Sequence, residues 1–167
     1  MAQQPPARPS INFAAQSTAT KILLIAGFLF FIDTFLPWNA LICFGGECGG
    51  SASAWGGSGG FLGVLAGLCA LALVVWEGLQ LMSVNLNLNV QTSKVSAALA
   101  AGTVLFGVIK FILALTNSPK FGAFIGIILL VAIAYGGYMK WQEPATVGPG
   151  IPPGRGPGTA PPGGFTT

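Results

Sequence analysis

The residues best suited to chemistry lie in the segment 38–59, which separates two long apolar stretches and contains Cys43, Glu47 and Cys48. Two cysteines at this spacing predict a disulfide that closes a small glycine-rich turn, if the segment faces an oxidising compartment. The alternative is a thiol-disulfide redox role, although the spacing CFGGEC differs from the C-x-x-C pattern of thiol oxidoreductases. Cys69 lies within the second apolar stretch, where we expect it to act as a packing residue.

Three ionisable residues fall inside apolar stretches: Asp33, Glu77 and Lys110. A charge near the bilayer centre costs ~2.5–3.5 kcal/mol on insertion scales, so such residues usually pair or line a wet cavity. Asp33 and Lys110 lie at similar depths from the outer ends of their stretches, which predicts an ion pair between them. Glu77 lies near an inner end, where its side chain can reach water or Lys94. The alternative is an ion or proton path through Asp33 and Glu77.

Most classes of enzyme are disfavoured by the composition. The chain has no histidine, which removes the Ser-His and Cys-His pairs that activate most nucleophilic enzymes. Only Cys43, Glu47 and Cys48 cluster as metal ligands, too few for a zinc site within one chain. No paired carboxylates, Walker-type loop or HExxH sequence is present either. We therefore expect a non-enzymatic protein without a metal or a cofactor. Its basic residues are scattered, so we expect no nucleic-acid binding.

The elements that carry these residues are predicted to cross a membrane. Hydrophobic residues make up 53% of the 167-residue chain and charged residues only 7%, far below the ~25% of soluble domains. Backbone groups in lipid must be satisfied internally, and a spanning helix needs about 17–25 apolar residues. The sequence predicts an all-α membrane protein, an antiparallel bundle of four transmembrane helices within 20–142. The expected spans are 20–37, 60–82, 95–116 and 121–138.

The distribution of lysine and arginine predicts the orientation of the bundle. Cytoplasmic segments are enriched in these residues. With both termini cytoplasmic, in a bacterial cytoplasmic membrane, only Lys120 faces outside. The basic residues on the cytoplasmic side are then Arg8, Lys21, Lys94, Lys140 and Arg155. Trp38, Trp55 and Trp141 are expected to anchor the bundle at the membrane interfaces.

The terminal segments 1–19 and 143–167 are rich in proline, glycine and small polar residues, which predicts disordered cytoplasmic tails. The inner connection 83–94 alternates asparagine with apolar residues. This period of two suits a half-buried strand. We expect an extended linker there, and strand pairing with a second copy or a partner is the alternative.

Small residues repeat at four-residue spacing in three of the expected spans, a pattern that lets helices approach closely. They predict a compact bundle and are compatible with self-association. The residues are Gly59, Gly63 and Gly67, then Ala98 and Gly102, then Gly122 and Gly126.

Four short motifs carry a resemblance: FLPW at the end of the first stretch, SAWGGSGGFLG before the second, and then WEGLQL and GVIKFIL. Over residues 20–140 the chain resembles a group of actinobacterial four-pass membrane proteins that has no assigned function. The resemblance implies topology and origin but supplies no activity.

Taken together, these features predict a scaffold or accessory subunit of a membrane complex. Its expected partners are the lipid bilayer and a membrane protein or a second copy. A small oligomeric transporter or channel is the alternative, and the redox role of Cys43 and Cys48 is a third.

Overall fold

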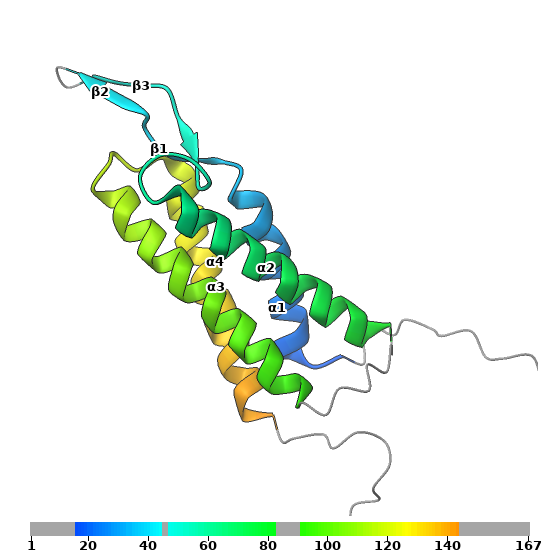
Figure 1. The fold of residues 1–167 in the computed structure, drawn as a ribbon. Coiled ribbons are helices and arrows are strands. Elements are labelled where there is room, and N and C mark those ends of the chain that lie inside the picture. Colours follow the sequence, from blue (N-terminus) through cyan, green and yellow to red (C-terminus); the bar gives the residue numbers. More distant parts are fainter. Residues whose placement is uncertain (1–15, 45–46, 83–90, 144–167) are drawn as a thin grey trace, which may run out of the picture.

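The computed structural model describes residues 16–44, 47–82 and 91–143, and these residues form four helices and four short strands (Figure 1). α2 occupies nearly the expected second span, whereas the first helix ends earlier than expected and the last continues beyond 138. The helices are α1 (Thr18–Asp33), α2 (Gly60–Leu81), α3 (Thr92–Leu115) and α4 (Phe121–Gln142).

Three of the helices, α2, α3 and α4, are long and apolar enough to cross a membrane. They also carry large apolar side chains on the outside of the protein, such as Phe61 at 72% exposure and Ile128 at 69%. α1 is equally apolar but has 16 residues, slightly fewer than a spanning helix usually needs. Its start is capped by Ser17, whose hydroxyl accepts a hydrogen bond from the Thr20 backbone N–H at 3.2 Å.

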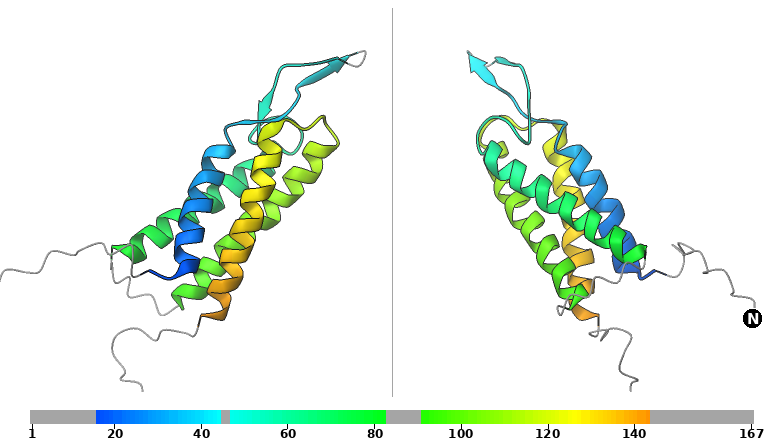
Figure 2. Two further views of the ribbon diagram at one scale, coloured as in Figure 1. Left: turned by 180° about the vertical axis from the view of Figure 1, so that it is seen from behind. Right: turned by 45° about the vertical axis from the view of Figure 1, so that its right-hand side comes forward.

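The helices lie side by side, with α1 and α3 running toward the end that carries the strands and α2 and α4 running away from it (Figures 1 and 2). α1 packs extensively against α2 and α4, and α3 packs against the same two helices. Consequently α1 and α3 lie diagonally across the group, as do α2 and α4.

Residues 34–59, which connect α1 to α2 and which we call the outer segment, contain four strands in their described part. The sequence did not predict these strands. β1 (Pro37–Asn39) pairs with β4 (Ala52–Ser53), and β2 (Ile42–Phe44) pairs with β3 (Glu47–Gly49). The β2–β3 hairpin projects beyond the helices (Figures 1 and 2). β1 also meets the α3–α4 connection, because the Lys120 backbone N–H donates to the Trp38 carbonyl at 2.9 Å. The segment is therefore anchored at both its α1 side and its α4 side.

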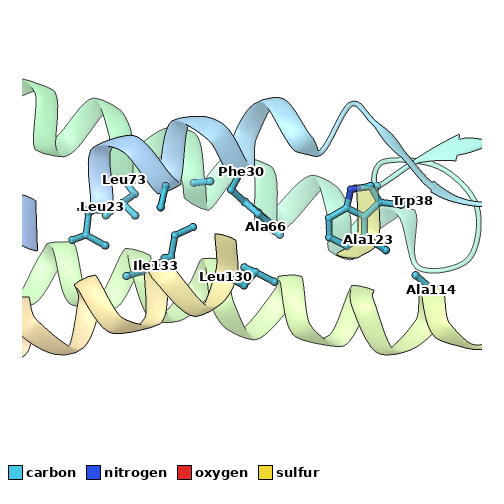
Figure 3. Packing of buried hydrophobic residues seen from close by; sticks show 13 residues of the cluster. Leu23, Phe30, Trp38, Ala66, Leu73, Ala114, Ala123, Leu130 and Ile133 are labelled. Carbon is cyan, nitrogen blue, oxygen red and sulfur yellow. The ribbon is translucent and has the colours of Figure 1, made fainter. Parts of the chain in front are cut away.

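The core is built from a few large side chains and many alanines and glycines. Leu23, Phe30, Leu73, Leu130 and Ile133 are each no more than 1% exposed (Figure 3). Small residues elsewhere allow the close approach that membrane helices require, since lipid supplies little apolar driving force for their association. Most of the predicted disordered tails and of the asparagine-rich connection lies outside the described residues.

Gly63 is the glycine of α2 that lies closest to a neighbouring backbone, which allows the packing to be tested. A Cβ added at Gly63 would lie 2.5 Å from the carbonyl carbon of Ala54, a backbone atom that cannot rotate away. A Cβ at Gly78 in the same helix would meet nothing within 4 Å. We expect Gly63→Ala to lower the free energy of unfolding in detergent by about 1–3 kcal/mol, and Gly78→Ala to leave it unchanged or raised. Equal effects of the two substitutions would contradict this packing.

Candidate functional site: ionisable residues inside the helix bundle

Asp33 is the last residue of α1 and is only 2% exposed. Neither oxygen of its carboxylate has a hydrogen-bond partner among the described residues. The Trp38 indole N–H donates to the backbone carbonyl of Asp33 at 3.0 Å. Gly126 of α4 provides the space, because a Cβ there would come within 2.7 Å of Asp33 Oδ2. Asp33 is thus a buried acid beside α4, with no counter-ion among the described residues.

Trp38 is fully buried and does not act as the predicted interface anchor. Its ring packs edge-on against Phe30, with centroids 6.3 Å apart and an interplanar angle of 82°. Figure 3 shows the indole beside Ala123, at the outer end of the core. The prediction was wrong because the rule for aromatic belts describes residues facing lipid, whereas β1 turns this side chain inward over the glycines of α4.

Lys110 is also fully buried, and its ammonium is held by the outer segment. Nζ donates to the carbonyl of Gly56 at 3.0 Å and to that of Ser58 at 2.7 Å. The amide of Asn39 approaches the same Gly56 carbonyl at 3.5 Å. Lys110 therefore ties the last third of α3 to the turn that precedes α2.

The predicted Asp33–Lys110 ion pair is not formed, although both residues belong to the described part of the chain. Asp33 is the last residue of α1, whereas Lys110 lies five residues before the end of α3. Lys110 Nζ is bound instead to the turn before α2, at the carbonyls of Gly56 and Ser58. Backbone carbonyls at the mouth of the bundle take the place of the carboxylate for Lys110.

A second charged group occupies the opposite end of the bundle. Glu77 is fully buried, and its Oε2 lies 3.9 Å from Nζ of Lys140, which is 6% exposed. Lys140 also contacts Glu143 at 3.1 Å. The sequence analysis paired Glu77 with water or Lys94 instead. Lys140 could have been found from the periodicity of α4, because it continues the buried face formed by Ile133, Gly136 and Gly137.

The apolar core separates these two charged ends. Along α1, Phe30 and Leu23 lie inward of Asp33, and along α2, Leu73 lies one turn outward of Glu77. Leu130 and Ile133 of α4 fill the same layer (Figure 3). Side chains packed at the density of a protein interior leave no room between them for a continuous chain of water molecules. Among the described residues, a layer of buried apolar side chains therefore lies between the two acids.

The two outer cysteines lie opposite each other in the β2–β3 hairpin, where Cys43 pairs with Cys48 in register. Directly opposed residues of an antiparallel pair have Cα atoms about 4.5–5.5 Å apart, within the range that a disulfide spans. Their side chains lie outside what the structure describes, so both the disulfide and the redox role stay predictions. Cys69 packs between helices, since a Cβ at Gly102 of α3 would lie 3.4 Å from its sulfur.

The other two tryptophans predicted as interface anchors lie on the surface. Trp55 is 36% exposed and rests against Phe35, with ring centroids 4.9 Å apart, while Trp141 is 66% exposed. Both positions are compatible with interface anchoring, which stays a prediction. Within the described residues there is no group of three histidine, cysteine or acidic side chains that could hold a metal ion.

Comparisons of the chain with protein-family models, with curated proteins and with solved structures find no match. The resemblance to actinobacterial four-pass proteins therefore stays a prediction. Any functional conclusion must rest on the residues described above.

The contacts of Lys110 predict the outcome of a double-mutant cycle. Lys110→Met should lower the free energy of unfolding by about 1–3 kcal/mol, because two buried carbonyls lose a charged donor. Asp33→Asn should not lower it, because the carboxylate has no partner to lose. The two effects should add within about 0.5 kcal/mol, as they do for independent sites.

Unfolding in mixed micelles measures both changes. Lys94→Met, which changes an exposed lysine of the same helix, is the matched control and should have an effect within about 0.5 kcal/mol. Recovery of stability when Asp33→Asn is added to Lys110→Met would instead favour a direct ion pair.

Proposed function

We propose that this protein is a non-enzymatic scaffold or accessory subunit of a membrane complex in a bacterial cytoplasmic membrane. The observation that carries the proposal is the packed interior. The apolar layer formed by Leu23, Phe30, Leu73, Leu130 and Ile133 separates the two buried acids. A single copy thus has a stable membrane-embedded body without a polar passage, which suits a binding role better than transport.

The proposal includes a fourth span formed by α1. Its 16 residues rise about 24 Å, somewhat less than the ~30 Å hydrocarbon layer. Phe28, Leu29 and Ile32 are about half exposed on its outer side, an arrangement that lipid stabilises and water does not. A short span is accommodated by local thinning of the bilayer at modest cost.

Both termini are proposed to be cytoplasmic. Lys21 and Lys94 lie near the starts of α1 and α3, and Lys140 lies near the end of α4, all at one end of the bundle. Lys120 lies at the opposite end, beside the strands. This asymmetry follows the positive-inside rule, which enriches lysine and arginine on the cytoplasmic side.

The β2–β3 hairpin is proposed to contact the partner outside the membrane. It projects beyond the helices (Figure 1), and its sheet has two strands in the described part of the chain. Isolated two-stranded hairpins are marginally stable in water, and their outer edges can accept a further strand. A strand from the partner would pair with an open edge of the hairpin and would stabilise it by adding a third strand.

Purification of the full chain in mild detergent from its native host, with mass spectrometry at native size, tests the proposal. We expect a reproducible partner in fixed stoichiometry. Replacing residues 42–49 with a glycine-serine linker of the same length should remove the partner, while the melting temperature of the bundle stays within a few degrees. A homo-oligomer without a partner would contradict the scaffold proposal.

The second candidate is a small oligomeric transporter or channel. It is favoured by the carboxylate of Asp33, which is 2% exposed and unpartnered and is therefore suited to take up a proton or a cation. Proton or cation flux into proteoliposomes, lost in Asp33→Asn, would establish this function instead. The scaffold proposal predicts equal and negligible flux for both proteins.

A further inference from the structure

A groove runs along the outside of the bundle between the inner halves of α3 and α4. It has a volume of about 450 Å³, with apolar walls. Its narrow floor results from small side chains on both helices, and Trp141 stands at its inner end. The small residues that line the groove are Ala97, Ala100 and Ala101 of α3 and Ala134 and Gly137 of α4.

The groove is confined to one leaflet. From Ala97 to Leu105, α3 rises about 12 Å, close to half of the ~30 Å hydrocarbon layer. Toward the end that carries the strands, Leu130 fills the space between α3 and α4. Its methyl groups lie so close to Gly107 that a Cβ added there would come within 2.7 Å of them. The rings of Phe111 and Phe124 meet just beyond. A partner helix would need contacts over the whole span, whereas one acyl chain needs only this length.

The inner mouth of the groove carries positive charge. Lys94 is exposed and lies three residues before Ala97 and seven before Ala101, on the same face of α3 as the groove. The start of α3 adds a partial positive charge, and its N-cap Gln91 makes no side-chain hydrogen bond there.

Two acids among the described residues lie at this end of the bundle, and both contact Lys140. Glu77 is fully buried, with its Oε2 3.9 Å from Lys140 Nζ. Glu143 falls on the side of α4 opposite Ala134 and Trp141 by helical periodicity, and its carboxylate is bound to Lys140 at 3.1 Å. Tyr138 and Trp141, 60% and 66% exposed, flank the mouth. Such aromatic side chains are enriched at the level of lipid headgroups.

We propose that this groove is a binding site for an anionic glycerophospholipid of the cytoplasmic leaflet. One acyl chain lies against the alanines of α3 and α4, and the phosphate lies at Lys94 beside Trp141. The site rests on the proposed orientation for its leaflet, but its chemistry requires only the groove and the charge. Basic sites between transmembrane helices on the cytoplasmic side bind anionic headgroups in this manner.

Native mass spectrometry of the purified full chain tests the site. The protein is exchanged into detergent with dioleoylphosphatidylglycerol or dioleoylphosphatidylcholine, which have identical acyl chains and differ in headgroup charge. We expect one retained lipid per chain and a preference for phosphatidylglycerol of about fivefold, the effect of one basic residue near the headgroup.

Two variants divide the site into its parts. Ala101→Leu fills the groove and should abolish retention of both lipids, whereas Ala72→Leu on the exposed face of α2 should not. Lys94→Gln should remove the preference for phosphatidylglycerol but keep the bound chain. Lys120→Gln, the same charge change at the other end of the bundle, should have no effect. If Ala101→Leu does not fold, Ala134→Leu fills the groove from the opposite wall.

Retention unchanged by Ala101→Leu, or a lipid preference unchanged by Lys94→Gln, would overturn the proposal. A dimer in place of a bound lipid, lost with Ala101→Leu, would also overturn it and make the groove a contact between copies. Because lipid retention is measured on the isolated chain, failure to find a protein partner does not affect the result.

Discussion

The ammonium of Lys110 and its two backbone carbonyls are the interaction on which the outer half of the protein depends. A charge buried within a membrane has no water to bind, so the chain itself must supply its hydrogen-bond partners. Lys110 meets this requirement by drawing the turn at Gly56 and Ser58 onto α3. The turn fixes the start of α2, and β4, which precedes it, pairs with β1. Through β1 the same network reaches Trp38, whose indole closes the outer end of the core.

The charges of the interior are divided between two ends, with an apolar layer between them. Glu77 and Lys140 join the diagonal helices α2 and α4 at the end opposite the strands, and Lys110 joins α3 to the turn that precedes α2. A buried ion pair contributes little net stability compared with apolar packing, but breaking it by removing one partner is costly. We therefore expect these contacts to add less to stability than the apolar packing does. Asp33 lies outside this scheme, which makes it the residue through which a transport function would have to act.

Length and hydropathy were sufficient to predict the helical character of the chain and nearly the limits of α2. They could not predict the partners of the buried charges. The positions of Asp33 and Lys110 in their spans suggested an ion pair, but position along a helix does not reveal that a nearby turn offers Lys110 two backbone carbonyls instead. Trp38 shows the same limit, since a tryptophan at the end of a span can face lipid or turn inward over glycine. Lys140 was readable from its place on the buried face of α4. The strands of the outer segment are too short for a clear alternating pattern.

The central claim is that the layer between Asp33 and Glu77 excludes water in the membrane. It is tested most directly by replacing Phe30, Leu73 or Ile133 with cysteine, one at a time, in a cysteine-free protein, and measuring reaction with a charged thiol reagent in native membranes. We expect all three positions to be unreactive in the folded protein, and a cysteine at the exposed Leu41 to react fully as the positive control. Reaction at any position of the layer that is blocked by a permeant ion would reveal a water-filled path and contradict the account.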